Sequence, residues 1–186
     1  RVVGVDILTP QEVRVAAAVP DGLPLARVDL PGVRSRVEAL APVDRVLVSR
    51  DWPDTVVVQV VERSAAAAVP QGRGFALIDD DGVAFQTVAA RPAHLPLARV
   101  ARPGPDDGNT RSALKVLAAL TDDLRERLVA VQVEGPARIT VELRGPRQVI
   151  WGDATDNETK ARVATALLAQ KGNTIDVSAP EVVTIR

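Results

Sequence analysis

VDRVLVSRDWPDTVVVQVVER, residues 43–63, is the stretch that decides the fold of the N-terminal part of this chain. Its second half places Val56, Val58 and Val60 on one face of a strand, because side chains alternate along an extended backbone. The many β-branched residues favour strand over helix. The intervening Asp51-Trp52-Pro53-Asp54 has turn chemistry, with a fixed proline φ and aspartates that bond their own backbone. The stretch therefore predicts a β-hairpin whose valine face must be covered by other elements.

Two helical patterns just upstream can supply that cover. Thr9-Pro10-Gln11-Glu12 is an N-terminal signature, with a capping threonine, a proline in the first turn and a glutamate three residues after the cap. Asp29 can cap a second helix, in which apolar residues recur at helical spacing. A short extended segment at residues 1–3 precedes both. The predicted order over residues 1–63 is therefore β-α-α-β-β.

The remaining sequence is richer in strands. Asp79-Asp80-Asp81-Gly82 lies between two apolar runs and predicts a hairpin with an Asp-Gly turn. We expect a helix capped by Asn109 or Thr110, a further turn of helix after Thr121, and a last helix capped by Asp156. Five more strands are expected at residues 129–134, 138–143, 148–151, 174–177 and 182–186. The predicted class is α+β, with a second, β-rich domain over residues 64–186 that has an antiparallel or mixed sheet and two or three helices.

Composition excludes several classes of function. A net charge of −1 gives no reason to expect a nucleic acid or an anionic membrane surface as partner. The absence of cysteine excludes disulfides, thiol catalysis and cysteine-based metal sites. No apolar run reaches the roughly 18 residues that cross a bilayer. Because the sequence starts inside a strand-like segment, we expect it to be a piece of a longer protein.

Candidate catalytic and metal-binding residues have simpler explanations. His94 is the single histidine and lies in a proline-rich loop, so it does not form a convincing catalytic triad. The acids of residues 79–81 and 153–158 could be imagined around a hard cation. A hairpin turn and helix capping explain them better. We therefore expect no catalytic residue, metal, cofactor or small-molecule substrate.

The C-terminal segment Val182-Val183-Thr184-Ile185 is the one feature with functional promise. It is the last strand of the sequence, and a last strand is often the edge of its sheet. An open edge offers unpaired N–H and C=O groups to a partner strand. An ordinary closing strand explains the same residues equally well, so the residues alone leave both interpretations open.

The whole chain resembles the FtsQ/DivIB family of bacterial cell-division proteins, in which a POTRA domain precedes a β-rich domain. No single motif decides this; the order and spacing of many short ones do. They are VVG (2–4), TPQEV (9–13), WPDT (52–55), VER (61–63), IDDDGVAF (78–85), LP (95–96), IWGD (150–153), Lys160 and IDV (175–177). Ser64 departs from the usual proline, and Trp151 replaces a common leucine.

The resemblance implies a non-catalytic scaffold that links early and late division proteins and regulates septal peptidoglycan synthesis. It implies FtsB/FtsL-type partners, and a protein held in the cell membrane by one N-terminal helix, with these residues on the extracytoplasmic side at the septum. A partner strand is expected at Val182, Val183, Thr184 and Ile185. Ser178 stands nearby, where the family often has a basic residue. Two alternatives remain: a POTRA-containing module for protein transport or assembly, and an extracytoplasmic wall enzyme.

Overall fold

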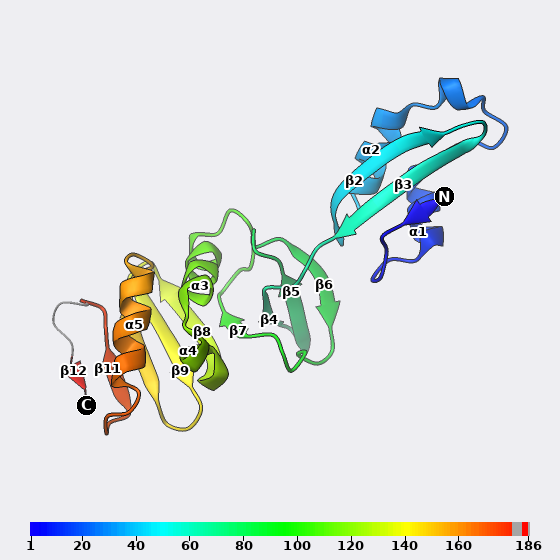
Figure 1. Cartoon of the computed structure of the whole chain (residues 1–186). Helices are drawn as coiled ribbons and strands as arrows, with labels where there is room; N and C mark the ends of the chain where they lie inside the picture. The colour runs from blue at the N-terminus through cyan, green and yellow to red at the C-terminus, as the bar shows by residue number, and fades with distance from the viewer. Residues whose placement is uncertain (180–183, 186) are drawn as a thin grey trace. The chain divides into compact units, whose positions relative to one another are not determined.

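The computed structural model describes residues 1–179 and 184–185. It divides the chain into two compact units, Arg1–Ser64, here called the N-terminal unit, and Ala65–Arg186, the C-terminal unit. Each unit has its own sheet and its own hydrophobic core, and each is described by itself (Figure 1).

The N-terminal unit has the β-α-α-β-β order that the sequence predicted, with one added turn of 3₁₀ helix at Leu25–Arg27. In its sheet the strand order is β1-β3-β2, with β1 parallel to β3 and β2 antiparallel to it. The elements are β1 (Val2–Val3), α1 (Pro10–Ala17), α2 (Leu30–Glu38), β2 (Val43–Asp51) and β3 (Thr55–Glu62).

Side-chain caps begin both helices of this unit. The Thr9 hydroxyl accepts from the Glu12 N–H at 3.2 Å, and the Glu12 carboxylate accepts from the Thr9 N–H at 2.7 Å, which is a complete capping box. The Asp29 carboxylate accepts from the Gly32 N–H at 3.1 Å. The helix α1 ends at Ala18, which takes a left-handed conformation with φ of 47°.

The valine face of the hairpin is covered, as predicted. Val58 and Val60 are buried against the two helices, whose Val13 and Val37 are fully buried. The opposite face of the sheet stays open, and Leu47 is 62% exposed there.

A glutamate at the end of β3 ties the unit together. The Glu62 carboxylate accepts hydrogen bonds from three consecutive backbone N–H groups, those of Asp6, Ile7 and Leu8, at 2.8–2.9 Å. The chain reaches this position through Gly4, whose φ is 82° and where an added Cβ would lie 2.2 Å from the Val60 carbonyl oxygen. The last residue of the last strand thus holds the loop that leads into α1.

The C-terminal unit is built on a mixed sheet with the strand order β12-β11-β10-β9-β8-β7-β4-β5-β6. The pairs β10–β11, β7–β8 and β4–β7 are parallel, and the others are antiparallel. The strands are β4 (Ala67–Gln71), β5 (Gly74–Ile78), β6 (Ala84–Val88), β7 (Leu97–Arg99), β8 (Leu128–Gly135), β9 (Arg138–Leu143), β10 (Gln148–Gly152), β11 (Thr174–Asp176) and β12 (Thr184–Ile185). The helices are α3 (Gly108–Ala119), α4 (Asp122–Arg127) and α5 (Asn157–Leu167).

The α+β class and the mixed sheet are confirmed, and two short strands are added to the prediction. Neither β4 nor β7 was expected. β4 is buried at Ala67, Ala68 and Val69, but alanine has a weak strand preference and Pro70 argues against a strand. The cap of α3 was also predicted wrongly, since Asp107 accepts from the Thr110 N–H at 2.7 Å.

The main core of this unit lies between the sheet and its three helices, α3, α4 and α5 (Figure 1). Trp151 is its largest fully buried apolar side chain, followed by Ile78 and Leu124. The β5–β6 hairpin forms as expected, with Asp79 at its turn. The Asp79 carboxylate accepts from the backbone N–H groups of Asp81 and Val83 at 3.1 and 2.8 Å.

Candidate interaction edge at the last strand

Among the described residues, β12 is the outermost strand on its side of the sheet. It runs antiparallel to β11, with Ile185 opposite Ile175 and Thr184 opposite Asp176. Thr184 is exposed. Of the other predicted contact residues, Val182 and Val183 lie outside the described residues, and Ser178 is an exposed residue just after β11.

The register shows which backbone groups of β12 face outward. The Val177 N–H donates to the Ile150 carbonyl of β10 at 2.9 Å, so the backbone groups of Val177 point to β10. By alternation those of Ile175 also point to β10, and those of Asp176 point to β12. Thr184 therefore faces β11, whereas the N–H and C=O of Ile185 are directed to the open edge.

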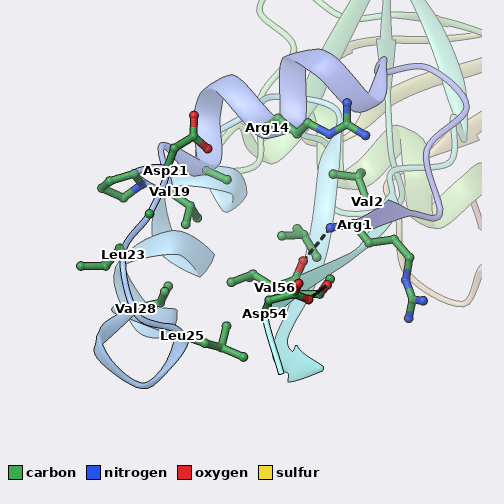
Figure 2. Close-up of a pocket in the computed structure, with 15 residues that line it drawn as sticks. Arg1, Val2, Arg14, Val19, Asp21, Leu23, Leu25, Val28, Asp54 and Val56 are labelled. Carbon is green, nitrogen blue, oxygen red and sulfur yellow. Dashed lines mark hydrogen bonds between the residues drawn. The ribbon is translucent and has the colours of Figure 1, made fainter. Parts of the chain in front are cut away.

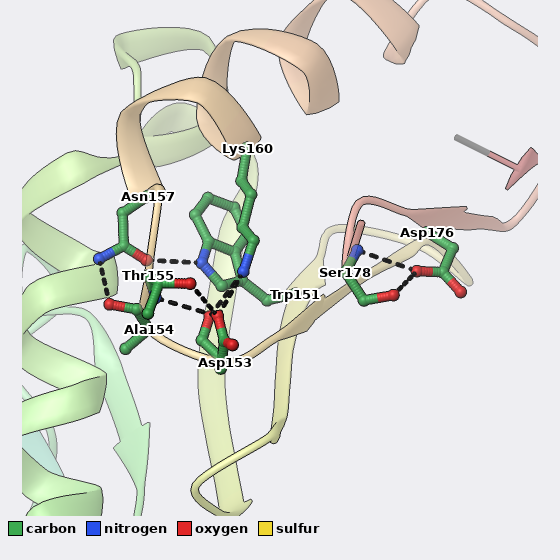
Figure 3. A network of polar contacts seen from close by, with 8 residues as sticks. All are labelled: Trp151, Asp153, Ala154, Thr155, Asn157, Lys160, Asp176 and Ser178. Atoms are coloured by element: carbon green, nitrogen blue, oxygen red, sulfur yellow. Dashed lines mark hydrogen bonds and ion pairs between the residues drawn. The ribbon is translucent and has the colours of Figure 1, made fainter. Parts of the chain in front are cut away.

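A side-chain turn ends β11 close to this edge. One carboxylate oxygen of Asp176 accepts from both the N–H and the hydroxyl of Ser178, at 3.0 and 2.7 Å (Figure 3). The hydroxyl of Ser178 is therefore already bonded within the turn. The turn therefore carries the negative charge of Asp176 next to the edge.

Gly152 allows this turn to lie against the end of β10. Its φ is 79°, and an added Cβ would lie 2.8 Å from Cβ and 3.1 Å from Cα of Ser178. The β9–β10 register also shifts between Ile150 and Gly152. A glycine is needed here for two reasons, its left-handed backbone and the close approach of Ser178.

Behind the edge, a buried lysine joins α5 to the end of β10. Lys160 is 1% exposed, and its ammonium donates to the Asp153 carboxylate at 2.7 Å and to the Asp153 carbonyl at 3.0 Å (Figure 3). The hydrogen bond from Lys160, helped by two from Thr155, lowers the pKa of Asp153 to about 2. The carboxylate side chain itself is 48% exposed, so water reaches one side of the pair.

This pair corrects the capping interpretation for two of the acids at residues 153–158, whereas Glu158 does lie in the first turn of α5. Asp156 stands before α5 with φ of 48° and makes no side-chain cap bond, whereas Asp153 serves Lys160. The sequence carried a usable signal: Lys160, Ala161 and Ala164 share one helix face, so the lysine stands on the apolar side.

Trp151 adds a second link between β10 and α5. Its indole N–H donates to the Asn157 side-chain oxygen at 2.8 Å, and the Asn157 amide donates to the Ala154 carbonyl at 3.0 Å (Figure 3). The indole is completely buried. The two links fix the segment between β10 and α5, and with it the strand that supports β11 and β12.

A second candidate is a hollow of about 420 Å³ in the N-terminal unit, beside β3 (Figure 2). Its lining residues include the apolar Val56 and Leu25 and the charged Arg14 and Asp21. Charges of both signs line it, so it does not select a ligand by charge. Within residues 1–179 and 184–185, no cluster of histidine and acidic side chains could hold a metal ion.

Comparison with known proteins covers both units. The model of the family "Cell division protein FtsQ/DivIB, C-terminal" matches residues 67–184, and that of "POTRA domain, FtsQ-type" matches residues 1–63.

Curated relatives include FtsQ of Mycolicibacterium smegmatis, 37% identical over 183 residues, which are 98% of this chain and 55% of that protein. FtsQ of Streptomyces coelicolor is 38% identical over 177 residues, 89% of this chain and 67% of that protein. Among solved structures, the major extracytoplasmic domain of DivIB from Geobacillus stearothermophilus is 16% identical, with a TM-score of 0.43 over 58% of this chain and 92% of that one. The chain thus spans between half and two thirds of the two relatives' length.

Proposed function

This chain belongs to the FtsQ/DivIB family of cell-division proteins, and we propose that it is a non-catalytic scaffold of the division machinery. Its partners are FtsB/FtsL-type proteins, and it links early and late division proteins so that septal peptidoglycan synthesis is regulated. In the full-length protein these residues lie on the extracytoplasmic side of the cell membrane, at the septum. In the part of the chain that the structure describes, no helix is long and apolar enough to cross a membrane.

The observation that carries this proposal is the outward-facing backbone of β12. The N–H and C=O of Ile185 point away from β11, and the neighbouring Thr184 side chain is exposed. A strand edge binds an extended peptide through main-chain bonds, while alternate side chains add specificity. Such binding needs neither a metal nor a catalytic group. Val182, Val183 and Ser178 belong to the same proposed contact.

Strand addition makes a residue-by-residue prediction, because neighbouring positions of β12 face opposite ways. Ile185→Pro removes an N–H that faces the partner and leaves the β11 ladder intact. Thr184→Pro removes an N–H that faces β11, so it weakens the fold of the C-terminal unit itself. We therefore expect Ile185→Pro to abolish partner binding at an unchanged melting temperature, and Thr184→Pro to lower that temperature.

The test is titration of the chain with the soluble coiled-coil part of the FtsB-like protein of the same organism. Wild type, Ile185→Pro and Val183→Pro are compared, with circular dichroism melting as the fold control. Binding by wild type and its loss in folded Ile185→Pro support the proposal. Equal binding by wild type and Ile185→Pro would exclude strand addition at this edge. Absence of binding by the wild type would exclude this partner class for the chain.

A further inference from the structure

We propose that β2 of the N-terminal unit is a self-association edge, at which two copies of the chain pair antiparallel about a twofold axis through Val48. The paired strands would join two three-stranded sheets into one of six strands. Pairing at β2 involves the N-terminal unit alone and is independent of partner binding at β12.

The strand β2 has an open side. In the order β1-β3-β2 it has β3 as its only neighbour within the described sheet. The Val58 N–H donates to the Arg1 carbonyl at 2.8 Å. The Val56 carbonyl accepts from the Arg1 amine at 2.6 Å (Figure 2). The backbone groups of Val56 and Val58 therefore point toward β1 and away from β2.

The antiparallel register of β2 with β3 determines which backbone groups of β2 face the open side. Val56 lies opposite Arg50, and Val58 lies opposite Val48. Where one member of an antiparallel pair points its N–H and C=O away from its partner, so does the other. Arg50 and Val48, and by alternation Val46, consequently direct their backbone groups to the open edge.

This edge of β2 is long and little protected against pairing with another strand. Protected edges carry prolines, lysines, bulges or charges that point inward. Between Arg45 and Asp51 the strand has no proline, no lysine and no register shift, because the one irregularity lies between Val43 and Arg45. The inward side chain of Arg50 is engaged by its own unit, since it donates to the carbonyls of Leu25 and Val28 at 2.8 and 2.7 Å.

A second copy of the chain is the partner that fits this edge, because β2 is complementary to itself in charge. With Val48 on the axis, Val46 of one copy lies opposite Arg50 of the other. The backbone N–H and C=O groups of both residues face the open edge, so they can bond to each other. The same register sets Arg45 of each copy opposite Asp51 of the other, on the solvent face of the sheet. Symmetry gives two such ion pairs for each dimer.

Both charged side chains are available for this contact. Arg45 and Asp51 have exposed fractions of 76% and 54%. Each now has one loose partner, Asp44 at 3.4 Å and Arg1 at 3.5 Å, and such exposed pairs contribute little and exchange readily. Opposite charges across a strand pair are favourable, whereas like charges directly opposite are unfavourable.

Apolar surface accompanies the charge pattern. Leu47, 62% exposed, lies between Arg45 and Asp51 on the same face. In the proposed register it faces Ser49 of the second copy and is diagonal to that copy's Leu47, within reach for a long side chain. Val61, 43% exposed and paired with Arg45, extends this apolar surface on each side.

The experiment is sedimentation velocity of the whole chain over a concentration series that reaches the millimolar range. Wild type is compared with Arg45→Asp, Asp51→Arg and the double variant that carries both changes. Each single reversal sets two like-charge pairs across the edge, so the dissociation constant should rise roughly tenfold or more. The double variant restores opposite charges at both places and should dimerise as wild type does.

A matched control reverses an exposed charge that is remote from the edge. Arg34 pairs with Glu38 within α2, so Arg34→Asp changes the net charge as Arg45→Asp does, without touching β2. It should leave the dissociation constant unchanged, and circular dichroism should show every variant folded. A monomer at all concentrations overturns the proposal. The proposed β2 register is wrong if the single reversals leave the dissociation constant of the dimer unchanged. It is also wrong if the double variant does not dimerise as the wild type does.

Discussion

Substitutions of Lys160 distinguish the contribution of packing from that of charge to the stability of the link between α5 and β10. The side chain is buried, but its carboxylate partner, Asp153, is half exposed. Lys160→Ala removes three buried methylenes beyond Cβ, worth roughly 2 kcal/mol. It also removes charge-assisted bonds of about 1.5–3 kcal/mol, from which water at Asp153 recovers a large part. The expected loss in unfolding free energy is about 3 kcal/mol.

Two further variants show how this loss in unfolding free energy is shared between packing and charge. Lys160→Met keeps most of the buried chain and loses the ammonium, so it should cost only about 1 kcal/mol. Asp153→Asn keeps an acceptor but leaves the buried ammonium without its counter-charge. This should cost about 2 kcal/mol, because an unpaired buried charge is more harmful than a half-exposed carboxylate that water can solvate.

The assay is urea unfolding followed by tryptophan fluorescence. Trp151 is buried beside this link, whereas Trp52 is exposed in the other unit, so a Trp52→Phe background leaves one reporter for the C-terminal unit. A cost for Lys160→Met equal to that for Lys160→Ala would refute the assignment of most of the loss to packing. A cost for Asp153→Asn below that for Lys160→Met would refute the argument from the buried charge.

The same pair makes the stability depend on pH. The pKa of Asp153 is lowered from 3.8 to about 2, so the folded state favours the carboxylate. Its contribution is fully present above the unfolded pKa and is lost as the pH falls from 3.8 toward about 2. Wild type should therefore lose its advantage over Lys160→Met in that interval, and a difference that stays constant would show that Asp153 is not the titrating group.

Three further changes probe single contacts. Glu62→Ala removes the acceptor of three backbone N–H groups at residues 6–8, so thermal melting should show the N-terminal unit destabilised by about 1–3 kcal/mol. Glu62→Gln keeps one acceptor oxygen and should destabilise the unit less. Gly152→Ala forces a left-handed alanine against Ser178 and should cost about 1–3 kcal/mol in urea unfolding, of which Ser178→Gly restores a part; an unchanged midpoint would contradict the close approach. Asp79→Ala leaves two N–H groups of the β5–β6 turn without their carboxylate, so hydrogen exchange should quicken there by about tenfold, and unchanged protection would count against the turn.

The fold followed from the sequence where local rules and burial agree. The hairpin valines, the Thr9 capping box and the Asp79 turn each combine a local signal with an alternating or helical apolar pattern. The strand β4 was not predicted, because its alanines and Pro70 argue locally against a strand. Only its pairing between β7 and β5, which local patterns do not contain, makes it one.

The candidate site was less accessible from sequence. The position of the last strand could be predicted, but the direction of its backbone groups depends on the register with β11, which local patterns do not contain. The partnership of Lys160 with Asp153 likewise requires the bend after β10. The sequence signal for this contact was a lysine on the apolar face of a helix.

The parallel pairing of β1 with β3 also has a mechanical consequence. Arg1 enters at the Val56 end of β3, whereas the chain leaves the unit beyond Glu62 at the opposite end. Tension applied between Arg1 and Ser64 therefore pulls the two strands past each other along their length, so their bonds share the load instead of opening one at a time. The three bonds of Glu62 to residues 6–8 resist the same displacement. A force along the chain therefore loads this unit in shear, the direction in which paired strands are hardest to separate.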